Sequence, residues 1–567
     1  MSFKQITQRL FFHNGAIRRA VNSHSKLLQQ KHFSTTRISR TVLASPYEDI
    51  PLPEINVGHY ILDKCRPFGS KVAFVNGITG QETTFNQFCD GVIKVASALT
   101  KLGIKKGDVV TLYSSNCPEF GILYVAVTAI GGIISTLNPL YTVGELSHAL
   151  AHSESRLLVT VPELTAVAKP AADACPTVKG IITFGDADGC RPFSNLLQDD
   201  GKDFPENLDI DAKNDVATLP YSSGTTGLPK GVMLTHHNLT SNVEQLVTEK
   251  IMNYTANDNL MGVLPFFHIY GGVVILLAGL AKGTKIVTLP KFDPEAFLQL
   301  AENHKVSFLH VVPPMALFLA KHPMIANYDL SNIHTFFVGA APVGGKTLGE
   351  VLERTNPSAT FRQGFGMTEA SPVTNCNPVS GDIKHDSVGH LIHNTKGKII
   401  DLETGKELEA GEEGEFLVHG PQVMKGYFKN PEASAGALEA DGWLHTGDIG
   451  YFDNDGHFYI TDRLKELIKF KGYQVAPAEL EAVLVTNPKI QDAAVIGLPD
   501  EKAGELPRAY VVLKPNETMS EEDVQAFVKG KVAAYKELSG GVIFRSEIPK
   551  SATGKILRRK LKDELKK

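Results

Sequence analysis

The chain has 567 residues, more than a single hydrophobic core ordinarily serves, so we expect at least two domains. Hydrophobic residues make up 43% and charged residues 21% of it, a globular composition that excludes a disordered or collagen-like chain. A net charge of −5 argues against a nucleic-acid partner held by bulk electrostatics.

The first 47 residues carry a strong charge bias. They contain eight lysines and arginines and no acid before Glu48, with frequent Ser and Thr and interspersed apolar residues. This composition is typical of a mitochondrial presequence, and a merely basic disordered tail is the alternative. We predict that residues 1–45 are a cleaved presequence and that the mature protein resides in the mitochondrial matrix.

From about residue 70, short β-branched runs bounded by Gly or Pro alternate with helical patterns. Buried strands are predicted at 108–115, 285–290, 306–313 and 335–342, with a helix at 294–304. This alternation predicts an α/β fold with layered, largely parallel sheets.

One long apolar run, residues 121–137, is the best candidate for a membrane span. It has only 17 residues and contains Gly131 and Gly132, so a buried helix packed against a sheet is the better interpretation. The apolar run 271–281 is shorter still. We therefore expect no transmembrane segment.

The character of the chain changes near residue 395. Up to about residue 460, Gly, Asp and Glu turns separate short strands such as 415–419, which predicts a β-rich subdomain. After Asp462 the chain restarts with strands and helices of its own, enough to fold alone. We predict a large N-terminal domain over 46–461 and a small α+β domain over 462–567.

The first motif that carries chemistry spans residues 221–231 and has the sequence Tyr-Ser-Ser-Gly-Thr-Thr-Gly-Leu-Pro-Lys-Gly. Hydroxyl donors, a cation and glycines that allow close backbone approach suit a polyphosphate. It is not a Walker A sequence, and a plain surface loop is the alternative. The candidate phosphate ligands are Ser222, Ser223, Gly224, Thr225, Thr226 and Lys230.

Four further motifs follow in the chain. Residues 363–369, Gln-Gly-Phe-Gly-Met-Thr-Glu, end in an acid that could carry Mg²⁺ on phosphate oxygens. Residues 443–448, Trp-Leu-His-Thr-Gly-Asp, offer a carboxylate for ribose hydroxyls. The basic stretch 460–472 and the segment 549–556, in which Lys555 follows a Thr-Gly turn, complete the set.

Together, in this order and spacing, the motifs resemble the adenylate-forming superfamily of acyl-CoA synthetases, 4-coumarate–CoA ligases and insect luciferases. The resemblance covers roughly residues 55–567. The 4-coumarate–CoA ligase-like branch is the most similar, on the segments 265–270 (Pro-Phe-Phe-His-Ile-Tyr), 339–342 (Gly-Ala-Ala-Pro) and 474–479 (Gln-Val-Ala-Pro-Ala-Glu). It implies a large N-terminal domain, a small mobile C-terminal lid and an active site between them.

The resemblance also implies the cofactors ATP, Mg²⁺ and coenzyme A. The loop 222–230 would then hold the β- and γ-phosphates, Thr368 would contact the α-phosphate, and Glu369 would bind Mg²⁺. The residues implied around the adenine, the acyl pocket and the ribose are Gln363, Gly364, Asp448 and Arg463.

Lys555 would approach the reacting carboxylate and the α-phosphate, where a preplaced cation stabilises the developing charge. A lysine in a basic C-terminal helix is the alternative interpretation. Rotation of the lid about Asp462 and Arg463 would withdraw Lys555 before the thiol attacks, as the family does. The residues implied in adenylate and CoA contacts are Lys465, Lys469, Lys471, Gly472 and Lys291. For the lysines, a solvated helix face is the alternative interpretation.

By the same resemblance, the acid pocket involves Tyr270, Val274, Ala341 and Gly364, with His268 as a gate or orienter. His268 could also be a packed histidine of an apolar loop. Valine stands at 274, where plant coumarate ligases often place a small polar residue, and this favours an apolar acyl tail.

We therefore predict an ATP-dependent acyl-CoA ligase for a medium-chain or other apolar fatty acid. It would form an acyl-adenylate and pyrophosphate, then acyl-CoA and AMP. The alternatives are a 4-coumarate-like aryl acid ligase, a luciferase-like oxygenase and a non-catalytic nucleotide binder. The predicted partners are a small carboxylic acid, ATP and CoA, and the oligomeric state is not predicted.

Overall fold

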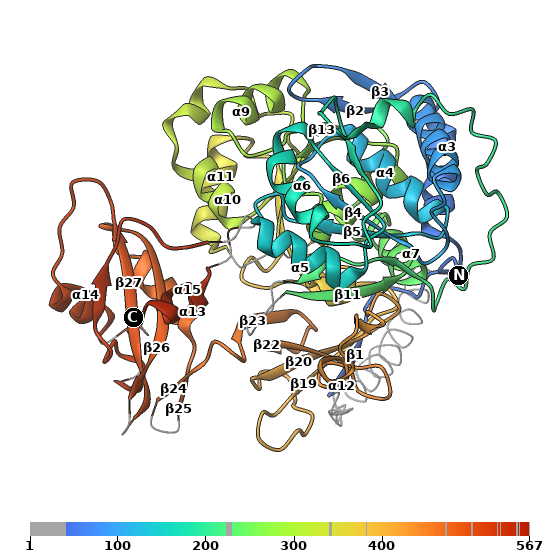
Figure 1. Ribbon diagram of the computed structural model, residues 1–567. Coiled ribbons are helices and arrows are strands. Elements are labelled where there is room, and N and C mark those ends of the chain that lie inside the picture. The colour runs from blue at the N-terminus through green and yellow to red at the C-terminus, as the bar shows by residue number, and fades with distance from the viewer. Residues whose placement is uncertain are drawn as a thin grey trace, which may run out of the picture. The chain divides into compact units, whose positions relative to one another are not determined.

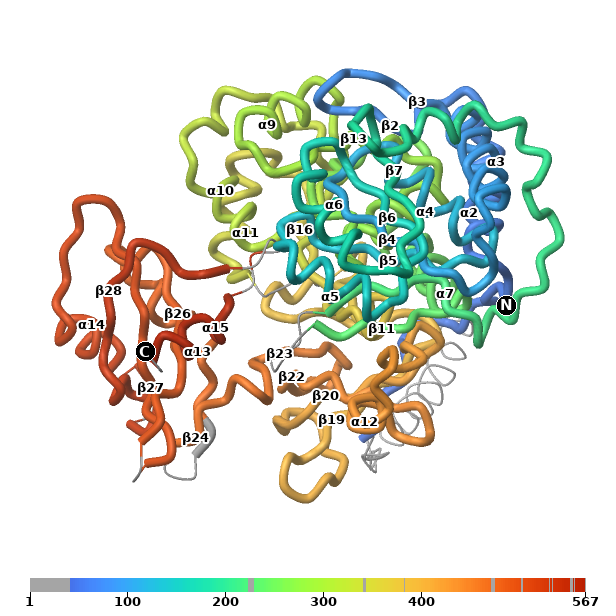
Figure 2. The backbone as a smooth tube through the Cα atoms, in the orientation of Figure 1, coloured from blue at the N-terminus to red at the C-terminus, as the bar shows by residue number. Residues whose placement is uncertain are grey.

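The computed structural model describes residues 41–222, 229–339, 343–381, 383–470, 473–500, 503–529, 531–532, 534–550, 554 and 556–565. Their strands form four sheets with helices between them, so the predicted α/β class is confirmed (Figure 1). Figure 2 traces the same path as a tube, coloured from the N-terminus to the C-terminus.

The first nine-stranded sheet has a parallel centre and an antiparallel edge. Along the sheet its strands are β10 (Tyr221–Ser222), β11 (Lys230–Thr235), β9 (Val216–Thr218), β5 (Ile133–Leu137), β4 (Val109–Tyr113), β6 (Leu157–Thr160), β7 (Ile181–Thr183) and β8 (Arg191–Pro192), and β21 (Gly426–Tyr427) pairs with β11.

The second nine-stranded sheet is parallel except at its two ends. Its order is β18 (His390–Leu391), β17 (Val373–Cys376), β16 (Thr360–Gly366), β15 (Thr335–Val338), β14 (Phe308–Val311), β12 (Asn259–Gly262), β13 (Lys285–Thr288), β2 (Val72–Asn76) and β3 (Glu82–Thr84). The predicted strands 285–290, 306–313 and 335–342 correspond to β13, β14 and β15.

A five-stranded antiparallel sheet forms the predicted β-rich part. Its order is β1 (Val42–Ala44), β19 (Lys396–Ile400), β20 (Gly414–His419), β22 (Leu444–Phe452) and β23 (Phe458–Arg463). The last sheet contains only residues beyond 467, in the order β25 (Tyr473–Val475), β24 (Ile468–Phe470), β27 (Gly504–Leu513) and β26 (Ile490–Asp500), with β28 (Val542–Phe544) paired to β27.

The α-helices of the described residues are α2 (Val57–Cys65), α3 (Phe85–Lys101), α4 (Pro118–Ala129), α5 (Val143–Ser153), α6 (Thr165–Asp173), α7 (His236–Leu246), α8 (Ala278–Ala281), α9 (Pro294–Asn303), α10 (Pro313–Lys321), α11 (Gly345–Arg354), α12 (Pro431–Ala435), α13 (Pro477–Val485), α14 (Glu521–Val528) and α15 (Arg558–Glu564). Short 3-10 turns occupy Arg66–Phe68, Pro162–Leu164, Phe193–Asn195, Pro323–Asn327, Thr368–Ala370 and Ala534–Lys536. A π-helix runs over Tyr270–Leu277.

Strand β4 shows why the first sheet is covered on both faces. Every residue of β4 is buried, as expected for a parallel strand between helices. Val110 and Leu112 face the large core that includes α2, α3 and α4. Tyr113 faces a second core with α5 and α6, which lie beside β4–β6 in Figure 1.

The apolar run 121–137 is not a single helix, so that part of the prediction is wrong. Helix α4 ends at Ala129 and strand β5 begins at Ile133. Gly131 adopts a left-handed φ of 73° between them, and the chain turns there. Within the described residues, no helix has both the length and the apolar surface that a membrane crossing requires.

Residues 1–40, most of the predicted presequence, lie outside the described residues. Strand β1, however, falls within the predicted 1–45 segment and pairs antiparallel with β19. A cut before Val42 would keep this edge strand, whereas a cut after residue 45 would remove it.

Candidate active site

The predicted phosphate loop begins and ends on paired strands. Strands β10 and β11 run antiparallel, and Ser222 lies opposite Lys230. Both residues are half-buried. The pairing therefore brings the first and last predicted phosphate ligands side by side. The other four, Ser223, Gly224, Thr225 and Thr226, lie outside the described residues.

A tyrosine that the motifs did not single out connects this hairpin to the predicted metal ligand. Strand β21 pairs with β11 and places the Tyr427 ring 4.6 Å from the Lys230 ammonium, a cation–π contact. The Tyr427 hydroxyl donates to Oε1 of Glu369 at 2.9 Å. Burial, and then the Glu369 charge, raise the pKa of Tyr427 well above its ordinary value. The cation, the phenol and the carboxylate thus form one continuous cluster.

Thr368 and Glu369 follow the carboxyl end of β16. They lie on the short helix Thr368–Ala370, and Glu369 is buried with 7% of its surface exposed. The carboxyl ends of parallel strands are where open α/β sheets bind their ligands. A buried carboxylate at this edge suits a hard cation bound to phosphate oxygens.

Gln363 and Gly364 lie within β16 itself. The Gln363 side chain accepts a hydrogen bond from the Val343 N–H at 3.3 Å and donates to the His385 carbonyl, so it ties two loops together. A side chain at 364 would bring its Cβ within 2.6 Å of the Phe337 ring. Only glycine therefore fits between β16 and that ring.

The predicted ribose ligands are also neighbours. Asp448 and Arg463 lie opposite each other on β22 and β23, and the Arg463 Nε lies 3.0 Å from Oδ1 of Asp448. Asp448 is 2% exposed. The pair therefore holds a carboxylate beside a guanidinium at the end of β23, and Arg463 is itself one of the two predicted hinge residues.

Two of the predicted acid-pocket residues, Tyr270 and Gly364, contact the same residue. The Tyr270 hydroxyl lies 3.1 Å from Nδ1 of His310 and 3.3 Å from the Phe337 carbonyl oxygen. A side chain at Gly339 would come within 2.9 Å of the Tyr270 ring. Gly364 lies against the Phe337 ring. Tyr270 and Gly364 are thus both neighbours of Phe337.

His310 is the second residue that the motifs did not reveal. It is fully buried on β14, and its Nε2 lies 2.5 Å from the Tyr254 hydroxyl, which donates to the Val274 carbonyl at 3.1 Å. Burial, and then the charge of the buried Arg362, lower the pKa of His310 to about 3. His310 is therefore neutral at physiological pH and bonded on both ring nitrogens.

The remaining pocket predictions have mixed outcomes. His268 is half-buried at the start of the π-helix, and its Nδ1 accepts from the Tyr270 N–H at 3.3 Å. Val274 is fully buried on that helix. Ala341 lies outside the described residues.

The lysines predicted to contact adenylate and CoA are not gathered at the hairpin. Lys291, Lys465 and Lys469 are exposed. Among the described residues, their ammonium groups form no hydrogen bond or ion pair with the β10–β11 hairpin. Their exposure fits both a ligand contact and a solvated lysine. The last three predicted residues, Lys471, Gly472 and Lys555, lie outside the described residues.

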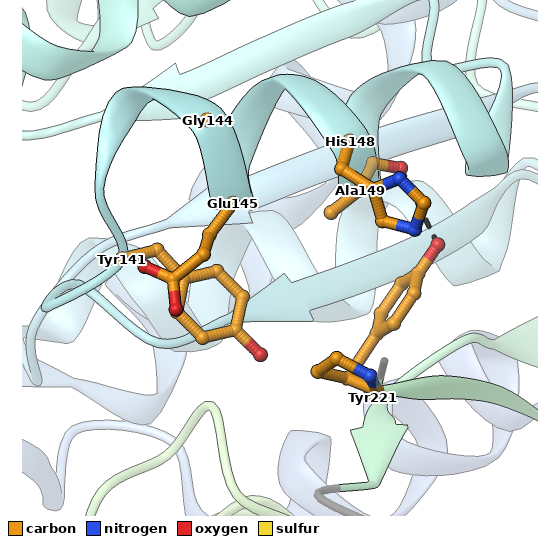
Figure 3. Close-up of a pocket in the computed structure, with 7 residues that line it drawn as sticks. Tyr141, Gly144, Glu145, His148, Ala149 and Tyr221 are labelled. Carbon is orange, nitrogen blue, oxygen red and sulfur yellow. Dashed lines mark hydrogen bonds between the residues drawn. The ribbon is translucent and has the colours of Figure 1, made fainter. Parts of the chain in front are cut away.

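A pocket of about 220 Å³ adjoins the hairpin and was not predicted. Its lining residues are Tyr141, Gly144, Glu145, His148, Ala149, Tyr221 and Pro229. In Figure 3 the rings of Tyr141 and Tyr221 lie on two sides of it, and the Tyr221 hydroxyl donates to the Ala149 carbonyl at 3.3 Å. The Tyr221 hydroxyl also lies 2.9 Å from Nδ1 of His152. Both contacts are with α5, so they attach strand β10, which leads into the phosphate loop, to that helix.

Family comparison agrees with this geometry. Residues 62–428 match the AMP-binding enzyme family, and residues 479–555 match the AMP-binding enzyme C-terminal domain. The chain belongs to the AMP-binding enzyme family. This AMP-binding enzyme is an acid–thiol ligase that forms AMP, with a large N-terminal and a small C-terminal domain.

Its relatives include CoA ligases of different names. A "Probable 4-coumarate--CoA ligase 1" of Dictyostelium discoideum is 43% identical over 92% of this chain and 98% of the relative. The ATP-bound crystal structure of MatB from Rhodopseudomonas palustris has a TM-score of 0.82 at 30% identity, covering 90% of this chain and 99% of that one. A Mycobacterium tuberculosis fatty acyl CoA synthetase has a TM-score of 0.70 at 28% identity, covering 90% and 98%.

The AMP-binding enzyme uses ATP, Mg²⁺ and coenzyme A with a small carboxylic acid. Its own residues fit the metal, because Glu369 offers a buried carboxylate beside the hairpin and only one of its oxygens accepts from Tyr427. Bound Mg²⁺ would neutralise phosphate charge there, while Lys230 supplies a second positive charge.

Proposed function

We propose that this AMP-binding enzyme activates a medium-chain or other apolar carboxylic acid. The observation that carries the proposal is the position of the Tyr270 hydroxyl, which bonds inward to His310 and Phe337. Two proton arrangements fit these contacts. In the first, Tyr270 O–H donates to Nδ1 of His310, Nε2–H donates to Tyr254, and Tyr254 donates to the Val274 carbonyl. In the second, Tyr254 donates to Nε2, Nδ1–H donates to Tyr270, and Tyr270 donates to the Phe337 carbonyl.

In both arrangements the phenolic hydrogen of Tyr270 is already used within the cluster. An acid bound against this residue would meet the face of an aromatic ring rather than a donor. Val274 is one turn further along the same π-helix, Tyr270–Leu277, whose residues are apolar and buried. This supports an apolar tail, and each buried CH₂ contributes about 0.8 kcal/mol, roughly a fourfold preference per carbon.

We further propose the residue roles of the first half-reaction. Ser222 and Lys230, with the loop between them, hold the β- and γ-phosphates, and the loop ligands are Ser223, Gly224, Thr225 and Thr226. Thr368 contacts the α-phosphate and Glu369 holds Mg²⁺. The residues that surround the nucleoside are Gln363, Gly364, Asp448 and Arg463.

The acid carboxylate attacks the α-phosphorus and pyrophosphate leaves. Lys555 supplies a cation at the attacking carboxylate, and His268 orients the acyl chain. In the second half-reaction the CoA thiol displaces AMP from the adenylate. We assign the contacts with adenylate and CoA to Lys465, Lys469, Lys471, Gly472 and Lys291. We assign residues 462–567 to a lid that rotates about Asp462 and Arg463 between the two steps.

We also propose that the enzyme works in the mitochondrial matrix after removal of its basic N-terminus. The acid-free composition of residues 1–47 supports this, and the pairing of β1 with β19 favours a cut before Val42. N-terminal sequencing of the protein isolated from cells tests it. A mature protein that begins at residue 1 or 2 would contradict it.

A second candidate substrate is an aryl-propenoic acid, because relatives at 43% identity are named 4-coumarate–CoA ligases. The test is pyrophosphate exchange and CoA-dependent AMP release across a panel that pairs octanoate with hexanoate and decanoate, and cinnamate with 4-coumarate. Our proposal expects a smooth dependence on chain length and no gain from the phenolic hydroxyl. A clear preference for 4-coumarate over cinnamate would favour the aryl acid, because a site that hydrogen-bonds the phenolic hydroxyl discriminates against the analogue that lacks it.

A further inference from the structure

Arg558, the first residue of α15, is buried among acidic side chains. It is 9% exposed. Its Nη2 lies 2.6 Å from Oε2 of Glu481, its Nη1 lies 3.2 Å from Oε2 of Glu466, and its Nε donates to the Val495 carbonyl at 3.2 Å. All three nitrogens of the guanidinium are therefore engaged.

These contacts close the open edge of β26. Strand β26 is at the end of its sheet, so the groups that point away from β27 need other partners. The Val495 N–H donates to Oε1 of Glu481 at 2.7 Å, and the Val495 carbonyl accepts from Arg558. Glu481 and Arg558 thus occupy the place of a neighbouring strand and join α13, β26 and α15.

The same helix α13 is tied to the predicted hinge. Oδ2 of Asp462 accepts from the Ala478 N–H at 3.1 Å in the first turn of α13, one turn before Glu481. Oδ1 of Asp462 accepts from the Arg463 N–H at 2.6 Å. A continuous set of bonds therefore runs from Asp462 through α13 to Arg558.

The cluster needs the geometry of arginine as well as its charge. Two carboxylates, the buried Glu466 and the half-buried Glu481, share one guanidinium. Burial raises the pKa of the nearby Asp462 to about 6 despite the opposing charge of Arg558. A lysine ammonium is a single point charge and cannot reach two carboxylates and a carbonyl in one plane. Arg558→Lys therefore keeps the positive charge but loses the simultaneous contacts of the guanidinium with Glu481, Glu466 and the Val495 carbonyl.

Lys555 precedes Arg558 by three residues, and the described residues on both sides of it are held. Ile556 pairs with Lys550, and the Leu557 N–H donates to the Pro549 carbonyl at 2.8 Å. We propose that Arg558 is a positioning residue for adenylation, which holds the chain directly after Lys555, residues 556–558, relative to the hinge through Glu481 and Glu466. The inference rests on the proposed role of Lys555.

The test compares Arg558→Lys in the parent and in a Lys555→Ala background, using the full chain and the best acid of the panel. Single-turnover pyrophosphate release measures adenylation, and CoA-dependent AMP release from supplied acyl-adenylate measures the second step. We expect Arg558→Lys to lower the adenylation kcat about 10–100-fold with KM for ATP changed less than about threefold, since a misplacement near 1 Å costs up to about a hundredfold. In the Lys555→Ala background the same substitution should cost almost nothing.

Arg545→Lys is the matched control, because Arg545 binds Glu564 at the other end of α15 through two nitrogens. It should leave both steps unchanged. Glu481→Gln keeps an acceptor for the Val495 N–H and should change adenylation in the same direction as Arg558→Lys. If Arg558→Lys does not fold, Glu481→Gln takes its place in the test. An equal loss in both half-reactions, or an undiminished loss without Lys555, would overturn the inference. An undisturbed adenylation rate in Lys555→Ala alone would instead overturn the proposed role of Lys555.

Discussion

The surroundings of His310 predict how the unfolding free energy changes with pH, in both sign and size. The imidazole is fully buried between Tyr254 and Tyr270, and its pKa is lowered to about 3 from the ordinary 6.5. The unfolded chain therefore takes up a proton as pH falls below 6.5, while the folded chain does not until about pH 3. The stability that His310 provides is complete above pH 6.5 and is lost progressively as pH falls from 6.5 toward 3.

Between pH 7 and pH 5 this single group should cost about 2 kcal/mol of unfolding free energy, at 1.36 kcal/mol per pKa unit. The figure depends little on the folded value, because any folded pKa below about 4 leaves His310 neutral at pH 5. His310→Gln keeps one donor and one acceptor for the two tyrosines but does not titrate. Its unfolding free energy should fall about 2 kcal/mol less over the same interval.

Urea unfolding at pH 7 and pH 5 measures the difference, because the other titrating groups cancel between parent and variant. His148→Gln, at an exposed position of α5, is the control and should keep the parent's pH dependence. If His310→Gln loses as much stability as the parent between the two pH values, the imidazole is not held neutral and the Tyr254–His310–Tyr270 arrangement is wrong.

Three further predictions concern the reaction and its site. Lys555→Ala should slow pyrophosphate release by several orders of magnitude yet preserve thioester formation from supplied acyl-adenylate, and equal losses would contradict this division. Gly364→Ala should raise KM for the acid or prevent folding, because its Cβ would lie 2.6 Å from the Phe337 ring, and unchanged kinetics would refute that contact. Tyr427→Phe should lower the unfolding free energy of the metal-free protein by about 1.5–3 kcal/mol, since Glu369 loses a donor to a buried charge. Tyr459→Phe, which loses a 3.1 Å bond to Asp453 at a turn, is the control for the denaturant titration and should cost less.

The elements that were predictable from sequence are those with a local cause. Strands β4, β13 and β14 are buried on both sides and read as short apolar runs bounded by Gly or Pro, and helix α9 begins with Asp293 as its N-cap. The run 121–137 failed because a buried helix and a buried strand are equally apolar, and only the backbone conformation at Gly131 separates them.

The candidate site shows the same division. Ser222 and Lys230 flank one loop, so their proximity follows from a short hairpin. Tyr427 was not predicted, because its position depends on the pairing of the two-residue strand β21 with β11. No local sequence pattern predicts so short a strand. His310 did leave a signal, since a lone histidine inside an otherwise apolar strand has to find partners for both ring nitrogens.

The three sheets of residues 41–463 each supply one part of the proposed nucleotide site. Lys230 comes from β11 in the antiparallel part of the first nine-stranded sheet, Glu369 from the carboxyl end of β16 in the second, and the Asp448–Arg463 pair from the five-stranded sheet. Tyr427 joins the first two parts, because its side chain contacts both the proposed phosphate lysine and the proposed metal carboxylate. Arg463, by contrast, is part of the proposed hinge at Asp462 and Arg463. A rotation there would act first on the ribose pair and leave the Lys230–Tyr427–Glu369 cluster in place, and the adenylate could then stay bound while the lid exchanges one set of lysines for another.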